Sequence, residues 1–317
     1  MNTGNSLDIL SGCQRLGTAE IVNRARANGL VIPAFNIPYL PMMRQVVRAL
    51  RDTNSFGMIA VARLEWIKFE SQSMSAVRAE YEHVRDERHT RLHLDHIPVI
   101  DEDNVTVDAE ADIAEAIRLG YESVMIDGSR LTFADNVKRT RNAVELAREA
   151  GIACEAELGA IMGHEAGPLP PYEELYVSGK GFTDPDEAVR FVNETGVDWL
   201  SVAIGNIHGA ISKVKKDERK VEARLNIAQL DRIHQAVGIP LVLHGGTGIR
   251  KEYIKEAIRH GIAKINVAAA LRQAWEQGIK SSRTTAEEAV YAATVKVIHE
   301  DFEIGNSADI LLKGIGL

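Results

Sequence analysis

Several features that mark specialised protein classes are scarce in this chain of 317 residues. The two cysteines, Cys13 and Cys154, lie too far apart to suggest a disulfide framework or a zinc ribbon. The longest apolar runs are too short to span a bilayer. Met1–Gly12 lacks the basic and apolar stretches of a secretory signal. We therefore expect a cytoplasmic protein that does not associate with membranes.

Charge of one sign is not concentrated anywhere in the sequence. The net charge is −8, yet acidic and basic residues are interspersed, and no basic stripe or aromatic-basic cluster indicates a nucleic-acid surface. With 45% apolar and 26% charged residues, the composition is that of an ordinary globular protein. The length suits one large α/β barrel or two ordinary domains.

Short apolar segments alternate with amphipathic helical segments from residue 30 onward, which indicates a parallel sheet. The expected strands are Val31–Ile37, Gly57–Arg63, Arg91–His96, Ser123–Asp127, Ala153–Leu158, Trp199–Gly205, Pro240–His244 and Lys264–Val267. The expected helices include Met42–Asp52, Asp108–Leu119, Phe133–Ala150, Pro185–Thr195, Ile227–Val237 and Lys251–His260. Repeats of this number and spacing favour a closed (β/α)8 TIM barrel over an open sheet.

No linker or composition shift divides the chain, so we expect a single domain over residues 1–317. It would carry an N-terminal helical extension (1–29) and extra C-terminal helices (268–317), which could close the barrel or pack on a neighbouring subunit. Glycines that suit the left-handed position ending a helix stand shortly before several strands: Gly120, Gly151, Gly196 and Gly261.

Two long segments without periodicity, Pro98–Val107 and Gly159–Asp184, follow the third and fifth expected strands. In a barrel both lie at the catalytic mouth, where long loops often act as lids or select substrates. The second segment contains Glu165. A carboxylate on such a loop can act as a base once closure removes water, although a simple solvated charge is the plainer interpretation.

Three histidines follow buried strands at matching places: His96, His208 and His244. The carboxyl ends of parallel strands meet at one mouth, so the three side chains should converge. Catalytic zinc typically uses three protein ligands and one open position. A single buried histidine is more simply explained by hydrogen bonds to the backbone, but three at one level favour a metal site. His93 should point into the barrel lower down.

Glycines follow two of these histidines directly, in His208-Gly209 and His244-Gly245-Gly246-Thr247-Gly248. Glycine lets backbone N–H groups approach an anion closely, and Thr247 adds a hydroxyl before a helix expected near Arg250. Barrels commonly bind phosphate at the loops after strands seven and eight. The pattern thus predicts a phosphate site, with a simple tight turn as the alternative.

Carboxylates also lie on the inward face of the expected barrel. Asp127 ends the fourth strand, and Glu155 and Glu157 share one face of the fifth. Buried carboxylates are costly unless they are paired. Lys264 and Asn266 of the eighth strand are natural partners, and Lys264 is equally well explained by a structural ion pair with a glutamate of the fifth strand.

Together these motifs resemble the class II (zinc-dependent) ketose-bisphosphate aldolases, which include fructose-bisphosphate and tagatose-bisphosphate aldolases. The resemblance covers about residues 30–272, with the motifs in family order. The matching segments are Ala34-Phe35-Asn36, His93-Leu94-Asp95-His96, Ser123-Val124-Met125-Ile126-Asp127-Gly128-Ser129, Glu155-Ala156-Glu157-Leu158-Gly159, Ala203-Ile204-Gly205-Asn206-Ile207-His208-Gly209, Leu243-His244-Gly245-Gly246-Thr247-Gly248 and Lys264-Ile265-Asn266-Val267.

The resemblance implies roles for individual residues. Asp95 matches the residue that exchanges a proton with the aldehyde-derived oxygen. Glu165 matches the loop acid that moves a proton at the nucleophilic carbon, and Asn266 matches the residue that orients the enediolate. The implied metal ligands are His96, His208 and His244, with Asp127 and Glu157 as carboxylates that can bind the metal in an alternative position. The implied substrate and phosphate contacts are Gly209, Gly245, Gly246, Thr247, Asn266 and Lys213.

The implied activity is reversible retro-aldol cleavage of a phosphorylated ketose to dihydroxyacetone phosphate and an aldehyde, through a zinc-stabilised enediolate. The implied cofactor is Zn²⁺ or another divalent metal, with a monovalent cation as a further candidate. The implied assembly is a homodimer or homotetramer. The helical tail Thr284–Ile304 is a candidate interface.

Departures from the family pattern gather around the substrate rather than the metal. They are Ala62-Arg63 in place of a strand-end Ser, Ile97-Pro98 in place of Gly, Arg130 in place of His, Thr247 in place of Ser, Ala269 in place of a hydroxyl residue, and the basic insert Lys213-Val214-Lys215-Lys216. Arg63, Arg130 and Lys213 could bind a carboxylate as readily as a phosphate. We therefore predict a substrate other than fructose 1,6-bisphosphate.

Three other functions remain open from the sequence. Lys264 could form a Schiff base, as a lysine does in metal-independent aldolases, although the histidines argue against it. The chain could be a non-catalytic metal-binding paralogue or partner subunit, which the retention of Asp95, Glu165 and Asn266 disfavours. A metal-dependent epimerase or decarboxylase of a sugar acid would pass through a similar enediolate.

Overall fold

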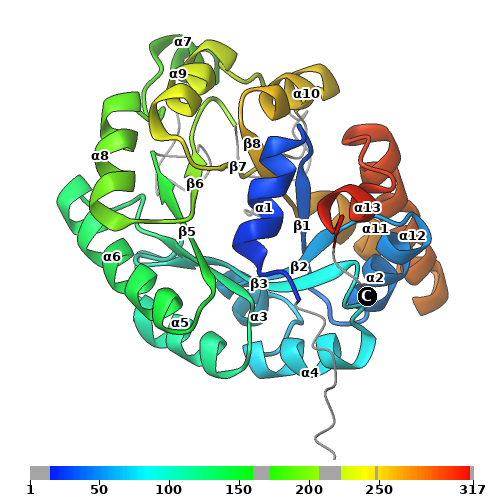
Figure 1. The fold of residues 1–317 in the computed structure, drawn as a ribbon. Helices are drawn as coiled ribbons and strands as arrows, with labels where there is room; N and C mark the ends of the chain where they lie inside the picture. Colours follow the sequence, from blue (N-terminus) through cyan, green and yellow to red (C-terminus); the bar gives the residue numbers. More distant parts are fainter. Residues whose placement is uncertain (1–14, 160–171, 207–222, 247–248, 315–317) are drawn as a thin grey trace, which may run out of the picture.

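The expected strands close into a parallel barrel in which each strand pairs with its neighbours in the sequence and the last returns to the first (Figure 1). The computed structural model describes residues 15–159, 172–206, 223–246 and 249–314. The strands are β1 (Ile32–Asn36), β2 (Gly57–Ala62), β3 (Thr90–Pro98), β4 (Ser123–Asp127), β5 (Ala153–Leu158), β6 (Trp199–Val202), β7 (Leu241–Leu243) and β8 (Ile262–Val267). The predicted (β/α)8 barrel is confirmed.

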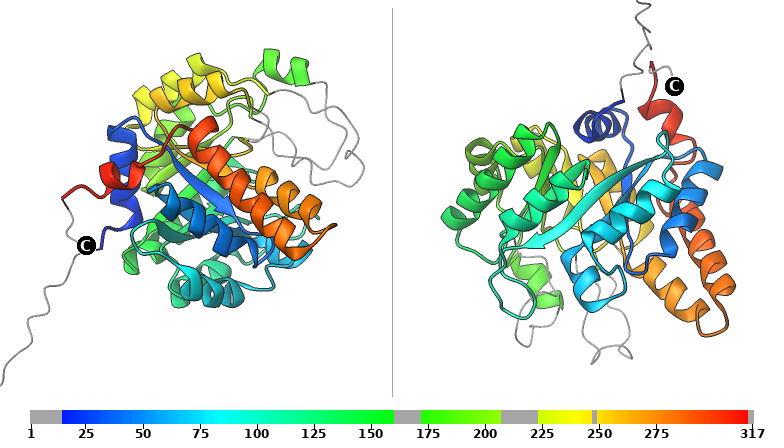
Figure 2. Two further views of the ribbon diagram at one scale, coloured as in Figure 1. Left: turned by 90° about the vertical axis from the view of Figure 1, so that its right-hand side faces the viewer. Right: turned by 90° about the horizontal axis from the view of Figure 1, so that it is seen from below.

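Helices surround the barrel and continue beyond its last strand (Figures 1 and 2). They are α1 (Thr18–Ala27), α2 (Met42–Asp52), α3 (Arg63–Lys68), α4 (Met74–Val84), α5 (Ala109–Arg118), α6 (Phe133–Glu149), α7 (Tyr172–Ser178), α8 (Pro185–Thr195), α9 (Ile227–Val237), α10 (Lys251–Arg259), α11 (Ala269–Gly278), α12 (Arg283–Lys296), a π-helical turn (Val297–Asp301) and α13 (Ser307–Leu311). In the described part of the chain, none of the helices has the length and apolar character needed to cross a bilayer.

Local chemistry explains why some helix ends could be predicted to the residue. Asp184 caps α8 by accepting the backbone N–H groups of Asp186 and Glu187 at 2.9 and 3.0 Å, and Pro185 occupies the first turn. Gly196 ends the helix with φ of +69°. A side chain in this left-handed conformation is costly, whereas glycine adopts it freely.

Several predicted boundaries are wrong. The third strand continues past His96 to Pro98, whereas the sixth and seventh are shorter than predicted. The segment Gly159–Asp184, predicted as a loop, contains helix α7. The segment Pro98–Val107 begins inside β3, and a bridge between Ile100 and Thr106 folds it into a short hairpin-like turn.

Side chains inside the barrel change from apolar to polar along its axis. At the amino-terminal end of the strands, α1 lies across the barrel (Figure 1), and its Ile21 packs in one cluster with Met58 and Trp199. Further along the axis, Glu155 and Lys264 are completely buried. Large apolar side chains contribute about 1.5–3 kcal/mol each when buried. The amino-terminal end of the barrel therefore contributes mainly to stability, and the polar side chains that could take part in chemistry lie toward the carboxyl ends of the strands.

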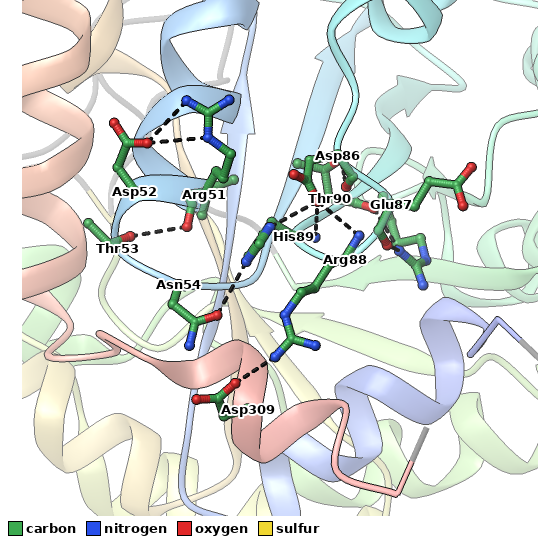
Figure 3. Close-up of polar contacts among 12 residues, drawn as sticks. Arg51, Asp52, Thr53, Asn54, Asp86, Glu87, Arg88, His89, Thr90 and Asp309 are labelled. Carbon is green, nitrogen blue, oxygen red and sulfur yellow. Dashed lines mark hydrogen bonds and ion pairs between the residues drawn. The ribbon is translucent and has the colours of Figure 1, made fainter. Parts of the chain in front are cut away.

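The C-terminal helix α13 fastens onto the same amino-terminal end, at the turn between α2 and β2. The backbone carbonyl of Asn54 accepts an N–H of α13 at 3.1 Å, and Arg88 pairs with Asp309 at 2.5 Å (Figure 3). His89 is hydrogen-bonded to Asp86 at 2.9 Å and to Asn54 at 3.3 Å. This polar cluster ties the end of the described chain to the base of β3.

Helix α12 packs on α2 of the same chain (Figure 2). Arg48 pairs with Glu288 at 3.2 Å and lies 4.2 Å from the ring centroid of Tyr291, whose hydroxyl donates to Asp52 at 3.2 Å. The predicted C-terminal helices are thus confirmed, and these contacts bind them to the barrel. That Thr284–Ile304 forms a subunit interface stays a prediction, as does the extent of the domain.

Candidate active site

A bulge in β3 brings two neighbouring residues, Asp95 and His96, to one side of the strand. The pairing of β3 with β4 shifts register between Leu94 and Ile97, and His96 has φ of +40°. A left-handed conformation at a residue other than glycine costs roughly 1–2 kcal/mol. In a regular strand the two side chains would point to opposite faces. The bulge lets Asp95 and His96 both contact residues of other strands.

Three side chains from β3, β5 and the end of β7 form a cluster with metal-ligand spacing. Each of these side chains offers one ligand atom, and the three atoms lie within 4.8 Å of one another in His96, Glu157 and His244. The rings of His96 and His244 are 4.5 Å apart and nearly perpendicular. The fourth strand adds Asp127, whose Oδ2 is 3.3 Å from Nδ1 of His96. His208, the third predicted histidine ligand, lies outside the described residues.

The electrostatics of this cluster favour a cation. Burial alone would lower the pKa of His96, but the hydrogen bond to Asp127 and the charge of Glu157 outweigh it and raise the pKa to about 10. Burial and the neighbouring Asp127 raise the pKa of Glu157 well above its usual range. A proton is therefore held among two carboxylates and an imidazole, where a divalent metal would replace it. Imidazole nitrogens and carboxylate oxygens are ligands that zinc accepts, so the residues fit this metal.

Groups beneath the cluster orient its members. Nε2 of His244 lies 2.8 Å from Oε1 of Glu155, and the amide of Asn206 donates to the backbone carbonyl of His244 at 2.8 Å. The hydroxyl of Ser201 donates to Glu157 at 3.2 Å. A carboxylate bound to one ring nitrogen is the usual support of a metal-ligating histidine.

Asp95 is held between two asparagine amides from β1 and β8. Asn36 donates to Oδ2 at 2.8 Å and Asn266 donates to Oδ1 at 2.7 Å. Burial would raise the pKa of Asp95, but His244, His96 and Lys264 lower it below its usual range. The side chain is therefore a carboxylate fixed in one orientation, as a proton acceptor at this position requires. Sequence analysis assigned no role to Asn36, although its place at the end of β1 is the signal that could have identified it.

Lys264 lies below these asparagines and exposes no surface. Its Nζ is 2.9 Å from Oε2 of Glu155 and donates to Oδ1 of Asn266 at 2.6 Å. The ion pair with the strand-five glutamate is thus present. A Schiff base needs a neutral amine within reach of a substrate, so this salt-bridged and fully buried ammonium disfavours the Schiff-base alternative.

The predicted phosphate site is only partly described. Gly245 follows His244 with φ of +67°, and a Cβ at Gly246 would lie 2.9 Å from Cγ2 of Ile265. Both positions therefore require glycine, so no side chain covers the backbone that follows His244. Four predicted residues lie outside the described parts of the chain: Glu165, Gly209, Lys213 and Thr247. Their roles remain predictions.

Two arginines considered as substrate ligands instead hold the turn that follows β3. Arg63 lies 3.5 Å from Oδ2 of Asp101 and 3.3 Å from Oδ2 of Asp112. Arg130 donates to the backbone carbonyl of Asp101, and to Oδ1 of Asn104 at 2.5 Å. Because protein groups already occupy both guanidiniums, the structure disfavours the prediction that they bind a substrate anion.

Glu65 of α3 is a buried acid beside this site that the sequence did not single out. Its Oε2 accepts the backbone N–H of Ala62 at 2.8 Å and lies 3.5 Å from Nδ2 of Asn36. Burial raises the pKa of Glu65 to about 8, the backbone hydrogen bond opposes this shift, and the charge of Asp95 adds to it. No sequence signal marks such a residue, because Ala62 has no side-chain oxygen that would indicate a capping box.

We expect the wild type to lose stability as the pH rises, because the buried Glu65 must ionise, and we expect Glu65→Gln to lose less. The folded-state pKa lies above the unfolded value, so the contribution is complete below about pH 4 and is lost as the pH rises through 8. Between these two pH values, each pH unit lowers the free energy of unfolding of the wild type by about 1.4 kcal/mol. In thermal unfolding from pH 5 to 9, the stability of the variant relative to the wild type should therefore increase as the pH rises. The control Glu87→Gln, at an exposed side chain, should follow the wild type. Parallel curves for wild type and Glu65→Gln would contradict the assignment.

Comparison with known proteins places this geometry in context. The family model described as fructose-bisphosphate aldolase class-II matches residues 17–309. The YdjI aldolase of Escherichia coli K12 has a similar structure, with 27% identity, a TM-score of 0.70, and coverage of 92% of this chain and 99% of that one. A candidate fructose-1,6-bisphosphate aldolase of Coccidioides immitis is 26% identical, with a TM-score of 0.73 and coverage of 92% and 98%. The fructose-bisphosphate aldolase of Campylobacter jejuni, at 19% identity, a TM-score of 0.68 and coverage of 90% and 94%, shares the fold.

Proposed function

The chain belongs to the class II fructose-bisphosphate aldolase family, and from this premise we propose that it is a metal-dependent aldolase acting on a phosphorylated ketose. The products would be dihydroxyacetone phosphate and an aldehyde, in a reversible reaction. One observation carries the proposal: the cluster of His96, Glu157 and His244 lies beside a carboxylate, Asp95, that two amides hold in place. Metal-dependent retro-aldol cleavage requires a metal site next to a fixed proton acceptor.

His96 and His244 would hold the metal together with His208, and Asp127 and Glu157 would be its alternative ligands. When bound, the divalent metal supplies a Lewis acid that polarises the ketone and offsets the negative charge developing on its oxygen. The donor set supports zinc and also admits other divalent ions.

Asp95 would take the proton of the hydroxyl group on the carbon beyond the breaking bond, as that oxygen becomes the aldehyde. Each carboxylate oxygen accepts one amide hydrogen bond, so lone pairs remain for the substrate hydroxyl. In the synthetic direction, Asp95 would return the proton. Asn266 would orient the substrate beside Asp95, and Glu165 would move the proton at the nucleophilic carbon.

The substrate we propose is a phosphorylated ketose other than fructose 1,6-bisphosphate. The altered position Ala62 supports this, because it pairs with Asp95 between β2 and β3 and offers no hydroxyl to a substrate. The surroundings of Asp95 therefore differ from the family pattern, while the metal cluster keeps it. Gly245 and Gly246 support a phosphate subsite after β7.

Metal removal tests the proposal directly. The zinc-loaded protein would be assayed against ketose 1-phosphates, ketose bisphosphates and keto sugar acids. The measured product would be dihydroxyacetone phosphate for the phosphorylated ketoses and the keto acid fragment for the sugar acids. We expect chelator-sensitive release from one panel member at about 1–1,000 s⁻¹, and its recovery when zinc is returned. Cleavage of fructose 1,6-bisphosphate at such a rate would refute the altered substrate. No cleavage of any member despite stoichiometric metal would refute the aldolase and favour an epimerase, a decarboxylase or a non-catalytic subunit.

A further inference from the structure

We propose that the buried Lys264–Glu155 ion pair is a positioning device that fixes two site side chains at once, the amide of Asn266 and the imidazole of His244. The pair bridges β8 and β5 across the barrel interior, directly beneath the mouth. Both side chains are completely buried, so neither touches substrate. The inference rests on the proposed aldolase function of this mouth.

The first half of the device sets the direction of the Asn266 amide. An ammonium group can only donate hydrogen bonds, so the amide oxygen must face Lys264, which it does at 2.6 Å. The amide NH₂ is thereby turned toward Asp95, where it donates at 2.7 Å. An amide rotated by half a turn would oppose NH₂ to the ammonium and oxygen to the carboxylate. The ammonium of Lys264 therefore ensures that the amide of Asn266 presents its NH₂, a hydrogen-bond donor, to Asp95.

The second half sets the orientation of His244. Glu155 uses one oxygen for Lys264, at 2.9 Å, and the other for Nε2 of His244, at 2.8 Å. As the acceptor, the carboxylate fixes the proton on Nε2 and the rotation of the ring. Its counter-ion is Lys264, and a buried carboxylate without one is strongly destabilising. The lysine thus acts on the metal cluster through Glu155.

The two halves form a continuous path from His244 through Glu155, Lys264 and Asn266 to Asp95. The path joins a candidate metal ligand to the candidate proton acceptor on the opposite side of the barrel. Stability alone does not explain the pair, because well-packed apolar residues in place of a buried ion pair are often equally stable or more so. Simultaneous orientation of two functional groups does explain it.

The test replaces both charges together in the variant Lys264→Met/Glu155→Gln, since removing one would leave the other unpaired. Without the ammonium, glutamine can turn either its oxygen or its NH₂ toward His244, so the imidazole is no longer held in one orientation. Methionine fills the volume without donating to Asn266. We expect a folded protein with kcat about 10–100-fold lower and KM within about threefold of wild type. Zinc affinity, measured by competition with a chromophoric chelator, should fall about 10-fold or more.

A second comparison separates positioning from a merely structural role. If the pair acts through Asn266, its replacement in an Asn266→Ala background should lower kcat by less than about threefold further. The same 10–100-fold loss in both backgrounds would overturn the positioning of Asn266. Ser123→Ala, which removes the hydroxyl bonded to His93 in the same buried region, is the matched control and should keep kcat and zinc affinity.

Zinc affinity also keeps the inference separate from the proposed function. If the wild type cleaves nothing, the aldolase proposal fails, yet lower zinc affinity in the pair variant still supports the positioning of His244. Wild-type zinc affinity in a folded pair variant would overturn that positioning. Should the pair variant fail to fold, the uncharged pair Lys264→Gln/Glu155→Gln takes its place, because it leaves no buried charge without a partner. Unchanged zinc affinity in that variant would overturn the positioning of His244.

Discussion

Replacing His244 by alanine should remove bound zinc and lower kcat/KM by about 1,000-fold or more. His244 lies in the cluster with His96 and Glu157, and the metal is expected to supply several kcal/mol of charge stabilisation, with every 1.4 kcal/mol worth a factor of about ten. Metal content after gel filtration and the rate on the substrate that the panel identifies would measure the effect.

The loss at His244 should not be a loss of fold. Glu155 keeps its ion pair with Lys264 when the imidazole is removed, so no buried charge is left without a partner. His83→Ala is the matched control, because this histidine lies exposed on α4. Stoichiometric zinc and a wild-type rate in a folded His244→Ala protein would show that the metal is held elsewhere.

Asp95→Asn should lower kcat by about 100- to 10,000-fold, the usual contribution of a positioned acid or base. The variant has nearly the same shape but cannot take a proton. An amide at this position also offers only one oxygen to the two donors, Asn36 and Asn266, that now bind the carboxylate. Zinc content should stay stoichiometric, because Asp95 is not in the metal cluster.

Steady-state kinetics and metal analysis together test the role of Asp95. We expect KM to change little, since the lost interaction belongs to the transition state. Asp103→Asn, at an exposed carboxylate on the turn after β3, should behave as the wild type. Undiminished kcat in Asp95→Asn would exclude this residue as the proton acceptor, whereas loss of zinc would place it among the ligands.

Strand boundaries could be predicted wherever the backbone hydrogen bonds of the sheet extend over the same residues as the apolar pattern in the sequence. Ser123–Asp127 and Ala153–Leu158 are strands to the residue. Beyond Val202 the apolar pattern continues, but the chain leaves the ladder because side chains take its N–H groups. Thr183 accepts the N–H of Ala203 at 2.8 Å, and Asn206 accepts that of Ile204 at 2.9 Å. No single-sequence pattern shows that exchange.

The site was predictable in its chemistry but not in its connections. Strand ends predicted where Asp95, His96, His244 and Asn266 would meet, and the structure brings these residues together. The bulge was not predictable, because a non-glycine residue with positive φ is uncommon and most histidines adopt negative φ. The link from Lys264 to both Asn266 and Glu155 depends on distances across the barrel, which spacing along the chain does not encode.

The bulge in β3 has a consequence for enzyme design. In an unbroken third strand, adjacent residues face opposite sides, so a barrel of identical topology could present the metal ligand or the proton acceptor at these neighbouring positions, but only one of the two. A single-residue deletion that straightened the strand would leave one residue where Asp95 and His96 now stand opposite β4, so one of the two chemical roles would be lost. Transplanting this chemistry into another scaffold therefore means transplanting a backbone distortion along with the side chains.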